Sequence, residues 1–555
     1  MSSPTLPSRP RRPLARPLPL AGVLRPVKPS DIWFKSALSV VVATAIPNVT
    51  LLVIGRLDLV MYTMAGSFCA LYAHNLPYAA RGRALAWVGA GMLGSMAVAL
   101  VAASLAGSAV VLVAVGALLA AAQKALCDAT RIGPPGHLIF TFISSASLFA
   151  PQTIGQVPGH LALTLGAAAV AWVVGMAPAV LRPHGPERRA TARALLAAAA
   201  HADSAAAGDT PAVVRTRGAA AAAVHAAWQS LLAAGERTAA RRALERLVVR
   251  AEDALAGPGA ADSGQLRAWA AGLRGTGAVP RPRDVRRGEE EELLGLEMEL
   301  SGARSSWWRR IGPGSPVLPI ALRTAVGCAL AGYASLALGI GRPYWALVTA
   351  ASLYQANVTL TWNRGVQRVV GNLVGVLAFA AIVPLAHLNH ALLIACCLAL
   401  AFGAEALITR NYWLGTVCVT PMALLVTEFA RFQEPGALIL DRVVDTLLGA
   451  LLGVVAAIAV TNRRATDRIE QAIDATERAR ARVDGHGASA HARRGLAAAL
   501  VDLRAAADAA AGEWWQRALP EHRVLVAEQA GHRTLAAAAT ATAIATAQRS
   551  GGIRG

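Results

Sequence analysis

The chain has 555 residues, of which 55% are hydrophobic, and its 53 lysines and arginines exceed its 33 aspartates and glutamates by a formal net charge of +20. A mean hydropathy of +0.46 is too high for an ordinary soluble protein and indicates membrane segments together with soluble ones. A basic balance is compatible with nucleic acid, an anionic membrane surface or anionic solutes, but most arginines flank apolar runs, which favours the lipid bilayer and argues against nucleic acid as a partner.

The first 30 residues are rich in proline and arginine. They contain no short apolar core followed by a cleavage site before Asp31, so a cleaved signal peptide is not expected. We expect residues 1–30 to form a disordered cytoplasmic tail beside the first membrane helix.

A first membrane block is predicted at residues 31–186. Its apolar runs are each close to the roughly 20 residues that cross the hydrocarbon core of a bilayer. The fifth run is short because Pro134, Pro135 and Pro151 interrupt it. The six predicted spans are 36–54, 57–79, 84–105, 109–127, 138–153 and 160–181.

Residues 187–310 are predicted to form helices outside the membrane. They comprise alanine-rich amphipathic runs, glycine- and proline-containing linkers, and the acidic helix start GEEEELLGLEMEL. The C-terminal region 463–555 has the same character. We expect the two regions to pack together as a cytoplasmic helical bundle whose charged residues face solvent.

A second membrane block is predicted at residues 311–462. Together the two blocks define an all-α integral membrane protein with about 12 spans. The six spans predicted in the second block are 317–338, 343–361, 366–385, 390–408, 412–429 and 441–460.

Basic residues are concentrated in alternate loops of both blocks, which predicts that each block begins and ends on the cytoplasmic side of a bacterial inner membrane. When the second block is aligned with the first at an offset of 281 residues, Arg364 aligns with Arg83. Arg364 lies with Arg368 in the predicted second turn of the second block. The same offset superposes Gly94 on Gly375 and Arg182 on Arg463. Two six-helix blocks of equal orientation predict a parallel pseudo-repeat.

Signatures of soluble enzymes are missing. The sequence contains no GxxxxGK[ST] run, no HExxH and no CxxC pair, so we expect no ATPase core, no metal site, no cofactor and no enzymatic activity. The six cysteines lie in or beside apolar runs and are interpreted as packing residues.

Polar residues inside apolar runs are the main functional signal. Arg323 either snorkels to the membrane surface or lines an anion path. Tyr354 and Asn357 carry hydrogen-bonding groups suited to a carboxylate, or they bond neighbouring helices. Glu405 either pairs with Arg410 or couples transport to protons.

Further polar, small and aromatic residues are interpreted structurally. Asp441 and Asp445 share a helix face with Arg442 between them, which favours a local ion pair over a proton relay. Four glycines at small-xxx-small spacing, Gly371, Gly375, Gly449 and Gly453, predict close helix crossings. The aromatic residues Tyr344, Trp345, Tyr412 and Trp413 are predicted to be anchors at the membrane interface.

The run GRPYWALVTAASLYQANVTLTWNRGVQRVVGNLVG, residues 341–375, resembles the signature hairpin of the FUSC family. These are fusaric-acid-resistance-type inner-membrane proteins, grouped with aromatic acid exporters and, more distantly, with plant aluminium-activated malate transporters. The matching features are RPYWA from Arg342 and the pattern RxxxRxxGxxxG from Arg364 to Gly375; Asn372 stands where the family usually has threonine. The resemblance implies a six-helix membrane unit followed by a cytoplasmic helical region, twice over, and export of organic or aromatic acids.

The resulting hypothesis is a transporter that exports small organic or aromatic anions. A passive anion channel and a membrane scaffold whose cytoplasmic bundle binds a partner are the alternatives. A homo-oligomer or an accessory subunit is left open. The candidate pathway residues are Arg323, Tyr354, Asn357, Arg364, Arg368 and Glu405.

Overall fold

The computed structural model describes residues 18, 20–27, 33–208, 210–234, 238–256, 261–275, 277–280, 317–355, 357–429, 432–460, 465–485, 489–511 and short stretches between 520 and 538. All regular structure in these residues is helical, and no strand occurs among them. The predicted acidic helix near residue 290 and most of the predicted N-terminal tail lie outside the described residues.

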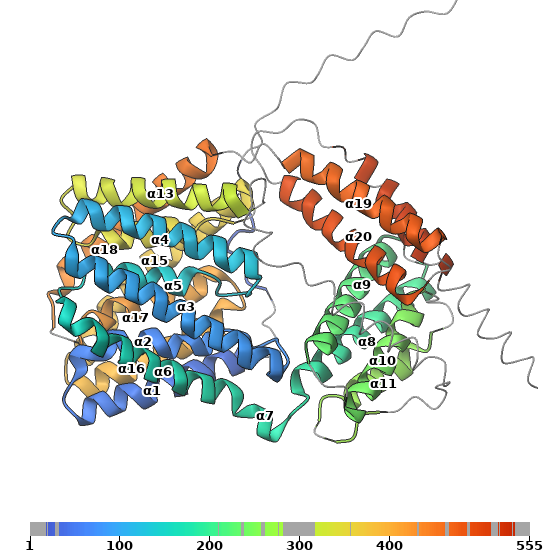
Figure 1. Cartoon of the computed structure of the whole chain (residues 1–555), viewed down its shortest axis with the longest axis horizontal. Helices are drawn as coiled ribbons and strands as arrows, with labels where there is room; N and C mark the ends of the chain where they lie inside the picture. The colour runs from blue at the N-terminus through green and yellow to red at the C-terminus, as the bar shows by residue number, and fades with distance from the viewer. Residues whose placement is uncertain are drawn as a thin grey trace, which may run out of the picture.

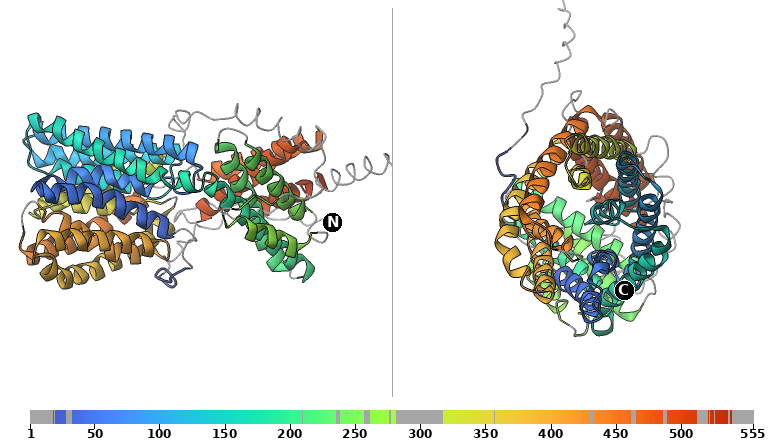
Figure 2. Two further views of the ribbon diagram at one scale, coloured as in Figure 1. Left: turned by 90° about the horizontal axis from the view of Figure 1, so that it is seen from below. Right: turned by 90° about the vertical axis from the view of Figure 1, so that its left-hand side faces the viewer.

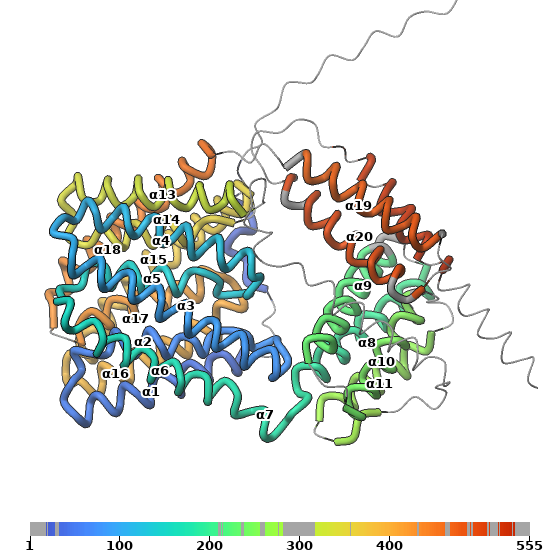
Figure 3. The backbone as a smooth tube through the Cα atoms, viewed as in Figure 1, coloured from blue at the N-terminus to red at the C-terminus, as the bar shows by residue number. Residues whose placement is uncertain are grey.

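The helices form two bodies, one of long apolar helices and one of more polar helices (Figures 1 and 3). We call them the membrane body and the helical body, and we call the end of the membrane body that faces the helical body its proximal end. The helical body contains α8 (Gly185–Ala206), α9 (Thr210–Ala233), α10 (Ala239–Ala256), α11 (Ser263–Gly272), α19 (Ala465–Gly485) and α20 (Ala490–Ala511).

The membrane body has two halves that lie on opposite sides when it is viewed end on (Figure 2). The first half contains α1 (Trp33–Val53), α2 (Val60–Ser67), α3 (Tyr78–Leu105), α4 (Ala109–Thr130), α5 (Leu138–Leu148), α6 (Val157–Met176) and the short α7 (Pro178–Leu181). The second half contains α13 (Val317–Ala337), α14 (Pro343–Ala351), α15 (Val358–Ala386), α16 (His390–Ile408), α17 (Tyr412–Val426) and α18 (Pro435–Ala459).

Eight segments in the described residues, rather than the predicted 12, are long and apolar enough to cross a membrane. The second and fifth helices of each half are too short: α2, α5, α14 and α17. Average hydropathy overestimates the lengths of these four helices because it does not detect where a helix breaks. The predicted span 57–79, for example, is helical only through Leu71, and Pro77 precedes the start of α3.

The corresponding break in the second half corrects the position of two arginines. α14 ends at Ala351 and α15 begins at Val358, so Arg364 and Arg368 lie inside a helix and not in the predicted turn. The Asn357 side chain starts α15 by accepting a hydrogen bond from the Leu360 N–H at 2.8 Å. All nine residues of α14 are buried. Irregular backbone within a membrane is tolerated only where protein or a water-filled space covers it.

The packing of the first half is repeated in the second. Within the first half, α1 packs on α2 and α6, α2 on α6, α3 on α5 and α6, and α4 on α5. Within the second half, α13 packs on α14 and α18, α14 on α18, α15 on α17 and α18, and α16 on α17. The first helix of each half also packs against the fourth helix of the other half, because α1 contacts α16 and α13 contacts α4.

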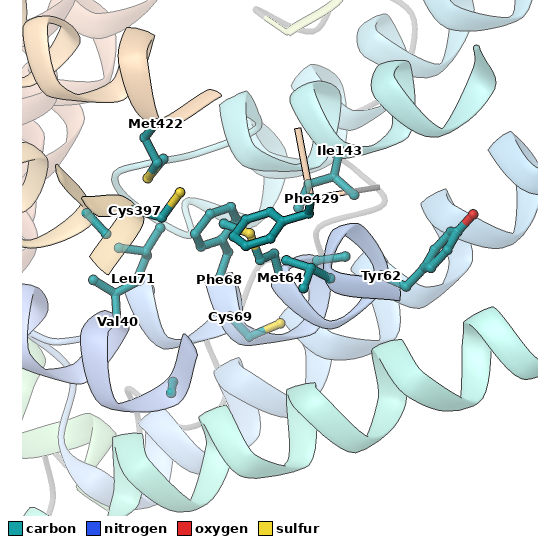
Figure 4. Packing of buried hydrophobic residues seen from close by; sticks show 14 of the residues in the cluster. Val40, Tyr62, Met64, Phe68, Cys69, Leu71, Ile143, Cys397, Met422 and Phe429 are labelled. Atoms are coloured by element: carbon teal, nitrogen blue, oxygen red, sulfur yellow. The ribbon is translucent and has the colours of Figure 1, made fainter. Parts of the chain in front are cut away.

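A hydrophobic cluster joins the halves inside the membrane body (Figure 4). Phe68, which follows α2, and Phe429, which follows α17, both belong to it and are both 4% exposed. One bulky residue from each half therefore lies in this cluster, and burial of each aromatic side chain stabilises the contact by about 2 kcal/mol.

Contacts outside this core were not predicted. Trp413 Nε1 donates to the Leu24 carbonyl at 3.0 Å, and Gln367 Nε2 donates to the Val23 carbonyl at 2.8 Å. Residues 20–27 are therefore bound to the start of α17 and to α15. In the helical body, the Arg494 guanidinium lies 4.1 Å from the ring centroid of Trp228, which joins α20 to α9.

Candidate functional site

Tyr412, at the start of α17, is the meeting point of two arginines from α15. The Arg364 guanidinium carbon lies 3.2 Å from the centroid of the Tyr412 ring. Arg368 Nη1 donates to Tyr412 Oη at 3.1 Å. Tyr412 is 7% exposed, so the prediction of an interfacial anchor is wrong for this residue, and its ring and hydroxyl hold two cations inside the membrane body.

Asn372, near the middle of α15, connects this pair to a third arginine. Asn372 Oδ1 accepts from Arg442 Nε of α18 at 3.2 Å and from Thr420 Oγ1 of α17 at 2.6 Å. Asn372 Nδ2 donates to the Arg368 carbonyl at 3.1 Å. One amide thus links α15 to α17 and α18 and holds the Arg442 guanidinium.

Trp345 of α14 lies between two further cationic contacts. The guanidinium carbons of Arg442 and Arg342 lie 5.2 Å and 5.3 Å from its ring centroid, within the range of cation–π attraction. Trp345 is 1% exposed, so this side chain is not an interfacial anchor either. We refer to Arg364, Arg368 and Arg442, together with Tyr412, Asn372 and Trp345, as the arginine cluster.

The arginine cluster has more positive charge than its neighbours neutralise. The Nε atoms of Arg364 and Arg368 and Nη1 of Arg442 are buried and have no hydrogen-bond partner. Among the described residues, no carboxylate lies within 4.0 Å of these three guanidinium groups. Asp445, one turn along α18 from Arg442, accepts instead from Ser335 Oγ at 2.7 Å.

The acid one residue before Arg442 is paired elsewhere. Asp441 Oδ2 accepts from Arg342 Nη1 at 2.8 Å, and Arg342 also donates to Gln433. Arg442 contacts Asn372 and Trp345 instead of either acid. The predicted local pair of Asp441 and Asp445 with Arg442 is therefore wrong, because neighbouring residues on α18 face different helices.

The other predicted pathway residues lie in three places. Arg323 of α13 is 1% exposed, and its Nε donates to the Val460 carbonyl at the end of α18. The Tyr354 hydroxyl packs directly against Gly327, which lies one turn after Arg323 on α13. A Cβ atom on Gly327 would collide with this hydroxyl. Asn357 caps α15. Glu405 of α16 faces Ser36 of α1 and is not among the residues that contact the arginine cluster.

The four glycines lie at close helix crossings. A Cβ at Gly371 would lie 2.6 Å from Thr416 Cβ, and one at Gly375 would lie 2.7 Å from Thr420 Cβ, so α17 crosses α15 there. A Cβ at Gly449 would lie 2.5 Å from the Ala346 carbonyl oxygen, and α14 crosses α18 at this point. These crossings bring Tyr412, Asn372, Trp345 and Arg442 together.

Four residues of the arginine cluster were not pathway candidates from the sequence: Arg442, Tyr412, Trp345 and Asn372. One face of α18 carries a pattern that could have identified Arg442. Gly449 follows Arg442 by seven residues and Gly453 follows Gly449 by four, so the three residues lie on the same face of the helix. The face that carries the two glycines against α14 therefore also carries Arg442 toward Trp345. Among the described residues, no group of three or more His, Cys, Asp or Glu side chains could hold a metal ion.

The arginine cluster lies in a part of the chain that matches a known family model. Residues 329–456 match the family described as fusaric acid resistance protein-like. A 208-residue stretch is 31% identical to the "uncharacterized membrane protein YvaC" of Bacillus subtilis (strain 168), covering 36% of this chain and 32% of that protein. The chain therefore matches only about a third of that relative's length. No solved structure matches the chain. The chain is a multi-pass membrane protein, and its residues 329–456, which contain the whole arginine cluster, form a fusaric acid resistance protein-like domain.

Proposed function

We propose that this protein exports small organic anions, in particular aromatic carboxylates, along a path that passes the arginine cluster. The observation that carries the proposal is the group of three guanidiniums, Arg364, Arg368 and Arg442, with buried unpaired N–H groups and no paired carboxylate. A buried charge is costly unless an opposite charge compensates it. A carboxylate that enters the site supplies this compensation and accepts two parallel N–H bonds from a guanidinium.

Two other buried arginines serve as an internal comparison. Arg81 of α3 donates to the carbonyls of Ala73 at 3.0 Å and Gly175 at 3.1 Å, and also to that of His74. Arg323 donates to the Val460 carbonyl. These guanidiniums bind backbone groups at helix ends, which is a structural role. The arginines of the cluster have donors left over, and this difference supports a ligand site.

The aromatic members of the arginine cluster favour a ligand that contains a ring. Trp345 presents one ring to Arg442 and Arg342, and Tyr412 presents one to Arg364. An aromatic acid would place its carboxylate on the guanidiniums and its ring against Trp345, with stacking worth about 0.5–1.5 kcal/mol. An aliphatic acid of the same charge would lack the second contribution.

The proposed architecture is a parallel pseudo-repeat of two six-helix halves about an axis along the membrane normal. The matching helix contacts within the halves, and the reciprocal contacts of α1 with α16 and α13 with α4, support it. We propose that the proximal end faces the cytoplasm of a bacterial cell, with both chain termini and the helical body on that side. Basic residues near this end, such as Arg83 and Arg182, support the orientation.

The test is flux of a labelled aromatic carboxylate, such as benzoate, in vesicles that contain the purified full-length protein. Replacing Arg368 or Arg442 by Gln removes a charged donor while keeping the side chain polar. A charge-assisted hydrogen bond contributes about 1.5–3 kcal/mol, so we expect flux to fall by about 10- to 100-fold. Arg83→Gln is the matched control, because Arg83 is exposed on α3 and lies outside the cluster.

The same vesicles separate the alternatives. Flux that increases with an imposed pH gradient supports coupled export, whereas flux that ignores the gradient and follows the anion's electrochemical potential supports a passive channel. Absence of benzoate flux in the wild-type protein, with no effect of Arg368→Gln on any organic anion tested, would refute transport through the arginine cluster and favour a scaffold.

A further inference from the structure

A basic cleft lies apart from the arginine cluster, where the membrane body meets the helical body. Its volume is about 580 Å³. The start of α1 and the end of α7 form its membrane side, and α8 with the residues after α11 forms its other side. Six basic side chains line it: Lys35, Arg182, Arg188, Arg189, Arg193 and Arg274.

Positive charge in this basic cleft is not balanced by its walls. No aspartate or glutamate is among the lining residues. Glu187, the nearby acid of α8, is buried, and among the described residues its ion-pair contact is with His184 at 4.0 Å. Burial, with Arg182 as a further cause, lowers the pKa of Arg188. The basic side chains therefore repel one another, and a bound anion would relieve the repulsion.

One of the six basic side chains builds the cleft and is not available to a ligand. Arg188 donates to the carbonyls of Gly277 at 2.7 Å, Leu273 at 3.2 Å and Gly272 at 3.3 Å. These bonds hold the segment after α11 against α8, so the cleft has a fixed wall. Arg182 is exposed and Arg189 is half-buried, and both have side chains open to an anion.

Exposed apolar side chains border the same basic cleft. Leu181 is 81% exposed and Phe34 is 41% exposed, and both are lining residues. They lie where the apolar segments of α1 and α7 end, which is the level of lipid headgroups in a membrane. A soluble anion gains nothing from these side chains, whereas the acyl chains of a lipid would cover them.

We propose that the basic cleft binds the phosphate of an anionic phospholipid headgroup, with the acyl chains against Phe34 and Leu181. Phosphate accepts paired hydrogen bonds from arginine, and basic pockets at the cytoplasmic membrane surface are suited to such headgroups. The bound lipid bridges α1 and α7 to α8, so it stabilises the attachment of the helical body to the membrane body. This site is separate from the proposed transport path.

The test uses the full-length protein in nanodiscs of phosphatidylcholine alone or of phosphatidylcholine mixed with phosphatidylglycerol or cardiolipin as the anionic lipid. We expect anionic lipid to raise the thermal unfolding temperature of the wild-type protein. We expect the double variant Arg182→Gln/Arg189→Gln to lose most of this increase while unfolding in pure phosphatidylcholine at the wild-type temperature or higher. The unfolding temperature in pure phosphatidylcholine should not fall, because the substitutions remove repulsion between the basic side chains of the cleft. Arg182→Lys/Arg189→Lys should retain part of the response.

The charge-matched control is Arg215→Gln/Arg478→Gln, since both arginines are exposed on the helical body and neither lines the basic cleft. It should respond to anionic lipid like the wild-type protein. An equal response of the cleft variant and this control would overturn the proposal. A wild-type protein that does not distinguish anionic lipid from phosphatidylcholine would overturn it as well. Soluble glycerol phosphate is the third arm, and a full response to it alone would identify a free phosphate as the ligand and overturn the lipid assignment.

Discussion

Asn372→Asp is a substitution that should separate stability from transport. The side chains have the same shape, but the carboxylate would stand where Asn372 Oδ1 now lies, 3.2 Å from Arg442 Nε. It would act as a built-in anion for the Arg442 guanidinium, whose Nη1 otherwise has no hydrogen-bond partner. We therefore expect it to compete with any transported anion.

The size of the effect follows from the contacts of Asn372. A unit charge pair about 4 Å apart interacts by about 4 kcal/mol at an effective dielectric constant of 20, and desolvation offsets part of this. The substitution also loses the hydrogen bond to the Arg368 carbonyl, worth about 1 kcal/mol. Stability should consequently stay within about 2 kcal/mol of the wild-type value. In the Asn372→Asp protein, the arginine cluster attracts an entering carboxylate less strongly by about 3 kcal/mol. This difference lowers flux roughly 100-fold.

The assay measures benzoate flux in vesicles and thermal unfolding of the same preparation. Asn372→Thr is the control, because it keeps a hydroxyl acceptor without adding charge and should retain flux within about threefold, the scale of a weakened neutral hydrogen bond. Wild-type flux in a stable Asn372→Asp protein would refute the reasoning, since it would mean that the guanidiniums of the arginine cluster do not contact the transported anion.

Two further predictions concern selectivity and pH. Trp345→Leu should lower benzoate flux about 10-fold more than acetate flux, because only benzoate loses ring stacking worth up to about 1.5 kcal/mol; equal losses in paired flux assays would count against a ring-binding role. Burial and the nearby Arg217 lower the pKa of His532 from 6.5 to about 4, so the folded state disfavours the proton that the unfolded state binds. The resulting stability is present above pH 6.5 and is lost as the pH falls toward 4, which hydrogen exchange of the helical body should detect. His532→Gln should flatten this part of the profile, and an unchanged slope would contradict the assignment.

Hydropathy and charge predicted much of the membrane body, but not its breaks. The long apolar helices, such as α15 and α16, follow directly from runs of apolar residues. After the break that follows α14, α15 starts at a capping side chain, Asn357, and an averaged hydropathy does not detect such a cap. Arg364 and Arg368 were therefore selected for their charge and placed in the wrong local structure.

The partners of these arginines could not be predicted for a different reason. Tyr412 and Trp345 have the composition and position of interfacial anchors, and only the crossing of α14 and α17 over glycines of α18 and α15 turns them inward. Arg442 lies beside two acids in the sequence, which favoured a local pair. Its neighbour in the structure is Asn372 of α15. The packing of α15 against α18 creates this contact, and the local sequence around Arg442 does not indicate it.

The reciprocal contact of first and fourth helices has a consequence for synthesis of the protein. α1 begins at Trp33, but α16, against which it packs, begins at His390. At roughly 5–20 residues per second, α1 waits on the order of tens of seconds after insertion before this partner emerges from the ribosome. α13 meets α4 at once, because α4 is already in the membrane. The nascent first half therefore has an unfilled face on α1 for much of translation, and a chain interrupted before α16 would expose that face to quality-control proteases.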